Sequence, residues 1–157
     1  MESVKNNPMN LDFTKIDEAN YSSAFQLQRQ CHAFPWSENM FKDCLTPPYF
    51  AEQLLMDDQV TGYYVGLLVS VEATLMDIGI DESMRGNGLG KLLLQRFLRE
   101  CNAKQAQEAW LEVRQSNAAA IKMYQDFDFQ LIETRKDYYP AEGGKEDALI
   151  MKLELGC

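Results

Sequence analysis

The sequence predicts a mixed α/β fold in a single domain that spans residues 1–157. Two observations support this fold class. Strand-like and helix-like segments follow one another in the order β-α-α-β-β-β-α-β-α-β-β. A glycine-rich loop also separates a short apolar, strand-like run from an amphipathic helical pattern. The length suffices for one hydrophobic core, and no internal repeat, low-complexity segment or linker divides the chain.

The first strand and two helices are predicted from local patterns. Residues 11–16 alternate between apolar and polar side chains, which predicts a strand. Asp17 is predicted to cap a first helix, which must end before Pro35 because proline disfavours helical geometry at the preceding residue. Ser37 is predicted to cap a second, shorter helix, and Pro47-Pro48 ends it.

Three strands and a longer helix come next. Residues 49–56 and 60–71 are predicted as strands, and the turn residues Asp57-Asp58-Gln59 join them into an antiparallel hairpin. Residues 73–81 form a fourth strand, which enters the glycine loop. The helix after the loop has apolar residues four apart. These residues are Leu89, Leu93, Phe97 and Cys101.

One strand, one helix and a hairpin complete the chain. Residues 110–114 alternate, with Leu111 and Val113 on one face and Trp110, Glu112 and Arg114 on the other. Either Ser116 or Asn117 is predicted to cap the next helix. The last elements are that helix over 118–127, a strand over 130–139, the turn Glu142-Gly143-Gly144 and a strand over 147–155.

The loop from Arg85 to Lys91 contains three glycines in five residues and precedes a helix N-terminus. Glycine lets the backbone approach a ligand closely, and a helix N-terminus offers unpaired N–H groups, so the loop suits a phosphate or pyrophosphate. The alternative is a plain turn with no ligand. A Walker loop is excluded because Leu92 stands where Ser or Thr is required. A dinucleotide fingerprint is excluded because Lys91 replaces its third glycine.

Charge and composition exclude several functions. The net charge of −9 argues against general affinity for nucleic acid or an anionic membrane. The excess of acidic residues lies before Arg85, which favours a basic partner, although it could serve only solubility. Residues 1–12 are too polar for a signal peptide and no apolar run approaches a membrane span, so we expect a cytoplasmic protein. The four cysteines are widely spaced, and we expect neither a metal site nor a disulfide framework.

The strand, the Arg-x-x-Gly-x-Gly loop at residues 85–90 and the following strand and helix with Asn117 and Tyr124 resemble the GNAT acetyltransferases, which bind acetyl-CoA. The resemblance implies a GNAT fold, with a mixed central sheet, antiparallel N-terminal strands and helices on both faces. It also implies direct acetyl transfer. Cys101 is predicted by its spacing to face the core, which argues against an acetyl-cysteine intermediate.

Three further segments resemble the family of bacterial ribosomal-protein alanine N-acetyltransferases. They are His32-Ala33-Phe34-Pro35-Trp36-Ser37-Glu38, Trp110 to Ile121, and Tyr138-Tyr139-Pro140 with Glu146-Asp147-Ala148. The likeness extends from about Asp12 to Leu155. It implies that the acceptor is a basic protein N-terminus, the alanine of small-subunit ribosomal protein 18. Other N-termini, lysines, small amines and a CoA-binding module without turnover are the alternatives.

The resemblance assigns roles position by position. Glu112 matches the general base and Tyr124 the general acid. The positions implied to bind acetyl-CoA are Ile78, Gly79, Ile80, Arg85, Gly86, Asn87, Gly88, Leu89, Gly90, Lys91 and Asn117. The positions implied to border the peptide are Phe34, Pro35, Trp36, Tyr138 and Tyr139. The chain departs from the family at Glu82, where proline is common, and at Asp128, where glycine is usual; Asp tolerates left-handed geometry better than most residues.

Spacing alone leaves each role open. Glu112 could be a solvated strand residue, Tyr124 a core residue, and Tyr138 and Tyr139 ordinary strand aromatics. His32 is the only histidine, but its Pro/Trp-rich surroundings favour a part in shaping the peptide pocket over catalysis. An α-amino group titrates near 7.7–8.0 and lysine near 10.4, so a single carboxylate base suits an N-terminal amine better, without excluding lysine.

Overall fold

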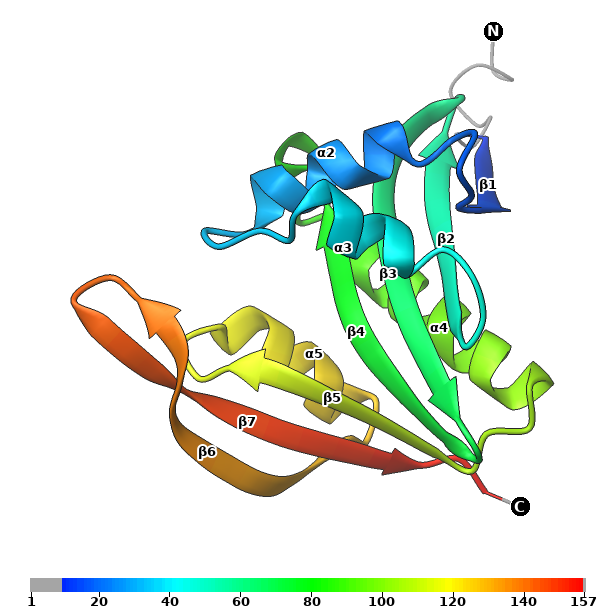
Figure 1. Cartoon of the computed structure of the whole chain (residues 1–157). Helices are drawn as coiled ribbons and strands as arrows, with labels where there is room; N and C mark the ends of the chain where they lie inside the picture. The colour runs from blue at the N-terminus through cyan, green and yellow to red at the C-terminus, as the bar shows by residue number, and fades with distance from the viewer. Residues whose placement is uncertain (1–9, 157) are drawn as a thin grey trace, which may run out of the picture.

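A computed structural model describes residues 10–156 and contains one seven-stranded sheet with helices on both faces (Figure 1). The strand order is β1-β2-β3-β4-β5-β7-β6. Only the β4–β5 pair is parallel among the described residues, so the sheet is mixed and its N-terminal strands are antiparallel, as predicted. The strands are β1 (Leu11–Lys15), β2 (Tyr49–Met56), β3 (Gln59–Val69), β4 (Glu72–Ile80), β5 (Glu108–Arg114), β6 (Gln130–Ala141) and β7 (Gly144–Glu154).

The helices divide between the two faces of the sheet (Figure 1). They are α2 (Ser22–Cys31), α3 (Glu38–Asp43), the 3₁₀ helix η1 (Glu82–Met84), α4 (Leu89–Ala103) and α5 (Ala118–Asp126). One core cluster joins α2 and α3 to the face that carries Tyr63, and the other joins α4 and α5 to the face that carries Tyr64. Within residues 10–156, no helix is both long and apolar enough to cross a bilayer.

Phe97 of α4 anchors the larger core. It is fully buried, stacks on Phe50 with ring centroids 5.9 Å apart and meets Tyr64 edge-on at 5.7 Å. Phe97→Ala should cost about 3–5 kcal/mol of unfolding free energy because it leaves a cavity. The corresponding fall in Tm, measured by calorimetry, is about 6–20 °C. Leu131→Ala, at an exposed site, is the control and should leave Tm nearly unchanged.

The sheet opens between β4 and β5. These strands pair only from Glu72 to Leu75 on β4 and from Glu108 to Leu111 on β5. Beyond that point β4 continues along β3 to Ile80, and β5 continues along β7 to Arg114. Residues 76–80 of β4 therefore have no strand partner on the side away from β3, and a gap forms between the two strands.

Most predicted boundaries are confirmed, and one cap is wrong. The side chain of Ser37 accepts a hydrogen bond from Met40 N, and Asn117, not Ser116, caps α5 through Ala120 N. Asp17 does not cap α2, which begins at Ser22 without a side-chain cap. Its carboxylate instead accepts hydrogen bonds from the backbone N–H groups of residues 19 and 20, because a short acidic side chain can close its own local turn.

Three smaller features complete the comparison with the predicted elements. The 3₁₀ helix η1 was not predicted; Asp81 caps it by accepting from Ser83 N at 3.0 Å. Asp128 has a φ of 72°, so aspartate does adopt the left-handed geometry expected at the end of α5. Cys101 is fully buried, as predicted. The segment 1–9 and Cys157 lie outside the described residues.

Candidate active site

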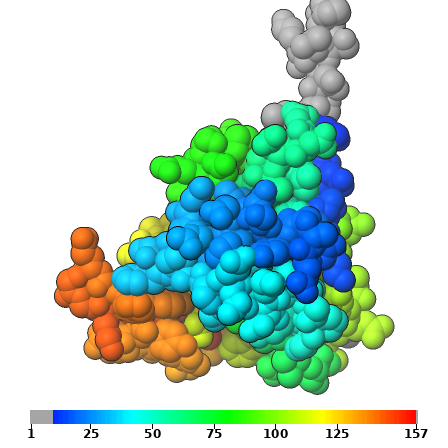
Figure 2. Space-filling view, turned by 45° about the horizontal axis from the view of Figure 1, so that its top comes forward, coloured from blue at the N-terminus to red at the C-terminus, as the bar shows by residue number. Residues whose placement is uncertain are grey.

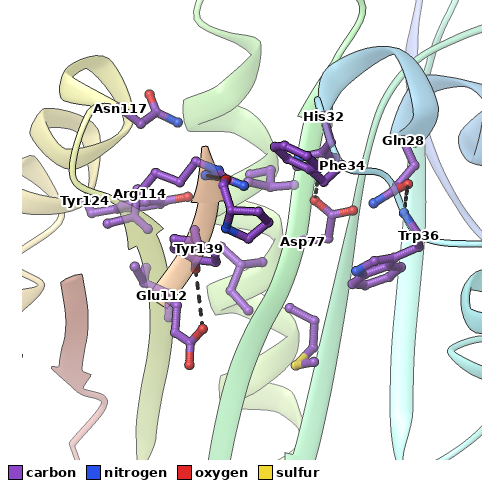
Figure 3. Close-up of a pocket in the computed structure, with 16 residues that line it drawn as sticks. Gln28, His32, Phe34, Trp36, Asp77, Glu112, Arg114, Asn117, Tyr124 and Tyr139 are labelled. Atoms are coloured by element: carbon purple, nitrogen blue, oxygen red, sulfur yellow. Dashed lines mark hydrogen bonds and ion pairs between the residues drawn. The ribbon is translucent and has the colours of Figure 1, made fainter. Parts of the chain in front are cut away.

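A cavity of about 330 Å³ lies where β4 and β5 diverge (Figure 3). Its walls come from the segment around the end of α2, from β4, from β5, from α5 and from β6. The lining includes Gln28, His32, Phe34, Trp36, Leu75–Ile78, Leu111–Arg114, Asn117, Tyr124, Tyr139 and Pro140. Residues more than 100 positions apart in the chain therefore meet here. The cavity contains both residues that the sequence singled out for acid–base roles.

Glu112 reaches the cavity because of the alternation of β5. Its neighbours Leu111 and Val113 are buried in the core, so its own side chain points to the opposite face. One carboxylate oxygen accepts from Tyr139 Oη at 3.4 Å and the other lies 3.4 Å from an Arg135 guanidinium nitrogen. Both contacts are long and the side chain is 36% exposed. The carboxylate therefore keeps accepting capacity for a substrate proton or a water molecule.

Tyr124 combines a core ring with a hydroxyl at the cavity. It is 4% exposed, and its ring meets Phe129 edge-on at 5.9 Å. Figure 3 shows its oxygen turned toward the cavity, at a different part of it from the Glu112 carboxylate. Burial, helped by the negative charge of Asp77, raises the pKa of Tyr124 above its usual value. The phenol is therefore protonated at neutral pH and can donate a proton.

A polar pair that the sequence did not indicate, the buried Asp77 and the partly exposed His32, lies on the opposite wall. Asp77 on β4 is 8% exposed and accepts a hydrogen bond from Tyr63 Oη at 2.8 Å. Its other carboxylate oxygen lies 2.7 Å from His32 Nε2. The hydrogen bond that His32 donates to Asp77 raises the pKa of His32 above its usual value, although burial opposes this shift. An aspartate inside the apolar run of β4 was the available signal, because aspartate is depleted in strands.

Arg114 brings two predicted peptide-site residues together. Its guanidinium lies 4.5 Å from the ring centroid of Tyr139 and 5.8 Å from that of Phe34. It also donates to Pro140 O at 2.9 Å and to Glu146 at 3.0 Å. Figure 2 shows the light-blue segment after α2 lying against the orange β6–β7 hairpin. Arg114 thus joins these two segments across one end of the cavity, a role that strand alternation alone did not reveal.

The other predicted peptide-site residues divide between two locations. Trp36 lines the cavity, and its backbone N–H donates to the buried side chain of Gln28 at 3.0 Å. Pro35 and Tyr138 do not line the cavity. Tyr138 is exposed outside it, edge-on to the ring of Tyr139 at 5.2 Å. Of the tyrosine pair, Tyr139 is therefore the one placed to touch an occupant.

The glycine loop has the geometry of an anion-binding site. Gly86 and Gly88 have φ values of 83° and 80°, and no atom would lie within 4 Å of a Cβ at either position. Gly88 is the N-cap of α4 and provides no side-chain cap, so the N–H groups of the first turn are free of a capping side chain. Arg85 and Lys91 are exposed beside them. The loop therefore offers donors and positive charge to a pyrophosphate.

The remaining cofactor positions fit an extended ligand arm. Ile78, Gly79 and Ile80 belong to the part of β4 that lacks a strand partner on the β5 side. Ile80 O already accepts from Cys31 Sγ at 3.4 Å and from Arg85 Nε at 3.3 Å, so a peptide-like chain there could pair with the backbone before Ile80 as a further strand would. Gly90 also has a steric reason to be glycine. A Cβ at this position would lie 3.3 Å from Met123 Sδ, where α4 meets α5. Leu89 is buried, so only its backbone is available to a ligand.

Comparison with known proteins agrees with this geometry. The acetyltransferase (GNAT) family model matches residues 18–129. The [ribosomal protein bS18]-alanine N-acetyltransferase of Salmonella typhimurium is 38% identical over 133 residues, which cover 85% of this chain and 90% of that protein. The enzyme of the same name from Escherichia coli K12 is 34% identical over 142 residues, with 90% and 96% covered.

Solved structures agree as well. The crystal structure of the ribosomal-protein-S18-alanine N-acetyltransferase from Escherichia coli has a TM-score of 0.90 and 33% identity, and covers 94% of this chain and 96% of that one. Arabidopsis thaliana NAA60 in complex with acetyl-CoA shares the fold, with a TM-score of 0.83 at 13% identity over 92% of this chain and 98% of that one. The chain belongs to the GNAT family of acetyltransferases, enzymes that use acetyl-CoA as acetyl donor.

Proposed function

We propose that this enzyme transfers the acetyl group of acetyl-CoA to the N-terminal alanine of small-subunit ribosomal protein 18. The observation that carries the proposal is the cavity between β4 and β5, which presents a carboxylate and a phenol in a chain 38% identical to an enzyme named for this reaction. That similarity covers 85% of this chain and 90% of the related enzyme. A ribosomal acceptor places the reaction in the cytoplasm.

The proposed mechanism is direct transfer within a complex of enzyme, acetyl-CoA and peptide. Acetyl-CoA supplies an activated thioester. Glu112 accepts a proton from the attacking nitrogen, directly or through a water molecule, and Tyr124 donates a proton to the departing sulfur. At pH 7 roughly 10–20% of an N-terminal amine is already neutral, against about 0.04% of a lysine side chain. An N-terminal amine therefore demands less of a single carboxylate base than a lysine side chain does.

The proposed seat of acetyl-CoA extends along two segments of this chain. The unpaired part of β4, at Ile78, Gly79 and Ile80, would hold the pantetheine arm by backbone hydrogen bonds. The loop from Arg85 to Lys91 would hold the pyrophosphate through the N–H groups at the start of α4. Asn117 contributes from the cavity wall, where its side chain also caps α5.

One assay tests the proposed function. An alanine-started basic peptide and its N-terminally blocked twin are offered with acetyl-CoA, and free thiol release is measured. Mass spectrometry then locates the acetyl group. We expect turnover with the free peptide alone and an acetyl group on its α-nitrogen. Equal turnover of the blocked twin would assign the enzyme to lysine acetylation, and no thiol release with either peptide would favour a module without turnover.

The tail of the peptide should also affect the rate. The net charge of −9, with the acidic excess before Arg85, favours basic residues after the terminal alanine. Replacing those residues by neutral ones should lower kcat/KM about 2–5-fold at low salt, because each exposed charge pair contributes little. The difference should shrink at high salt. Equal kcat/KM values for the two peptides at low salt would remove the idea of a basic partner.

A further inference from the structure

The stoichiometry of the proposed reaction requires two protons to leave the acceptor nitrogen. An N-terminal ammonium group must lose one proton before its lone pair can attack. It loses a second when the C–N bond forms and the C–S bond breaks. One of these protons ends on the CoA sulfur and the other is released to water. In the mechanism above, Glu112 receives the second proton and Tyr124 protonates the sulfur. The proton gained by Glu112 then restores the Tyr124 phenol through solvent, so both groups return to their starting forms and only the first proton has no assigned acceptor.

We propose that His32, oriented by Asp77, takes the first proton from the N-terminal ammonium group of the bound peptide. This inference rests on the proposed function. The neutral imidazole becomes imidazolium as the ammonium becomes amine, and the imidazolium then returns its proton to solvent. Glu112 acts afterwards, on the nitrogen that has attacked the thioester. His32 and Glu112 therefore deprotonate the same nitrogen in succession.

The hydrogen bond to Asp77 fixes which nitrogen of His32 is basic. A carboxylate can only accept, so Nε2, at 2.7 Å from Asp77, carries the hydrogen. Nδ1 then has a free lone pair, and among residues 10–156 no hydrogen bond to it is formed. Tyr63 holds the second oxygen of Asp77 at 2.8 Å, which fixes the carboxylate itself. The pair is thus oriented by groups that are almost fully buried.

The position of His32 suits an acceptor of the first proton. Figure 3 shows His32 and Asp77 on one side of the cavity, with Glu112 and Tyr124 on the other. A nitrogen in the cavity therefore lies between the two candidate bases. The His32 side chain is 36% exposed, so its proton can leave to solvent after each turnover. Asp77, by contrast, is too buried to exchange protons freely with water.

The pKa values of the α-amino group and the imidazole are also close to each other. An α-amino group titrates near 7.7–8.0 and an imidazole near 6.5, so proton transfer between them is close to balanced. Transfer from the ammonium to a carboxylate near 4.3 is disfavoured by more than three orders of magnitude. The hydrogen bond to Asp77, which raises the pKa of His32, brings the pKa of the imidazole closer still to that of the amine.

Charged and titratable groups from each neighbouring element act on His32 or on Asp77. Asp77 of β4 favours the imidazolium, and Arg114 of β5 opposes it. The charge of Asp77 also raises the pKa values of three buried groups, Tyr63 of β3, Tyr124 of α5 and Cys44 after α3. Since the hydrogen bond to Asp77 has the largest effect on the pKa of His32, His32 can accept a proton only when the pH is near or above a pKa that lies above its usual value.

The test is the pH dependence of His32→Gln relative to wild type, with kcat/KM measured on an alanine-started peptide. At pH 7 the variant must use the roughly 10–20% of peptide that is already neutral, so kcat/KM should fall about 5–10-fold. At pH 9 the amine is almost wholly neutral without help, and the two enzymes should agree within about twofold. Glu112→Gln is the contrast, because its defect should persist at pH 9, where the second proton must still leave.

Asp77→Asn is the second variant and keeps the shape of the pair. It removes the charge that makes His32 more basic, so the defect at pH 7 should be about 2–5-fold and should also vanish by pH 9. An unchanged kcat/KM at pH 7, or a defect of equal size at both pH values, would overturn the proposal and leave His32 with a structural role at the end of α2. A wild type that shows no turnover of the peptide would overturn the proposed function and this inference together.

Two measurements test whether the variants keep the wild-type fold and cofactor site. Circular dichroism and the Kd for acetyl-CoA should match wild type in both variants, because neither His32 nor Asp77 belongs to the proposed cofactor seat. If His32→Gln does not fold, Asp77→Asn decides the matter, since its pH-dependent defect requires an imidazole whose basicity the carboxylate sets.

Discussion

Tyr124→Phe is expected to lower kcat about 10²–10⁴-fold while the Kd for acetyl-CoA changes less than about twofold. The substitution removes one oxygen at the cavity and leaves the ring packed against Phe129. In the proposed mechanism this oxygen protonates the leaving sulfur, so its loss should slow the chemical step and spare binding. Steady-state kinetics by thiol release, together with a direct titration of acetyl-CoA, would measure both quantities.

The pH profile gives an independent check on the role of Tyr124. Burial raises the pKa of this phenol above its usual value of about 10, so wild-type activity should show no alkaline loss from its ionisation at pH 9. The matched control is Tyr21→Phe, which removes a phenol oxygen that bonds Glu38, away from the cavity. A wild-type kcat in Tyr124→Phe would contradict the assignment of Tyr124 as the general acid.

Glu112→Gln should lower kcat by about 10²–10³-fold at its optimal pH, because an amide cannot accept the proton released as the C–N bond forms. The side chain keeps its length and can still accept a hydrogen bond from Tyr139, so the site should keep its shape. KM for the peptide should change much less than kcat. Initial rates over a range of peptide concentrations would separate the two parameters.

Glu133→Gln is the matched control for Glu112. Glu133 also contacts Arg135, at 3.7 Å, but it does not line the cavity. Its substitution perturbs the same arginine without removing a candidate base. We therefore expect near wild-type kcat in Glu133→Gln. An equal loss in the two variants would show that Arg135, and not a base at Glu112, sets the rate.

The elements of the fold could be predicted because their signals are local. Alternation placed Leu111 and Val113 in the core and Glu112 outside it, as the structure confirms. Ser37 was identified as a cap from residue type and position alone, and Asn117 as one of two candidates with Ser116. Asp17 shows where this reasoning failed: the same side chain can cap a helix or close a turn, and nothing in the neighbouring residues indicates which of the two is formed.

The candidate site could be predicted only in part, because its other members meet through tertiary structure. The presence of Glu112 and Tyr124 in one cavity was expected from resemblance, while their acid–base roles stay predictions. His32 and Asp77 are 45 residues apart, and no periodicity relates the end of a helix to a strand across the sheet. Arg114 was placed on a strand face, but its stacking on Phe34 and Tyr139 depends on how a loop and a hairpin approach each other.

The short pairing between β4 and β5 determines how the two halves of the sheet are joined. Only four residue pairs connect the antiparallel half of the sheet, β1 to β4, to the half formed by β5, β7 and β6. Beneath the gap, one core cluster joins Leu75 of β4, Phe97 of α4 and Leu111 of β5, so side-chain packing connects the halves where the ladder does not. A ligand whose amide groups complete the missing ladder would act as a temporary strand. Such a ligand would add backbone hydrogen bonds between halves that the free enzyme joins by four residue pairs and a shared core.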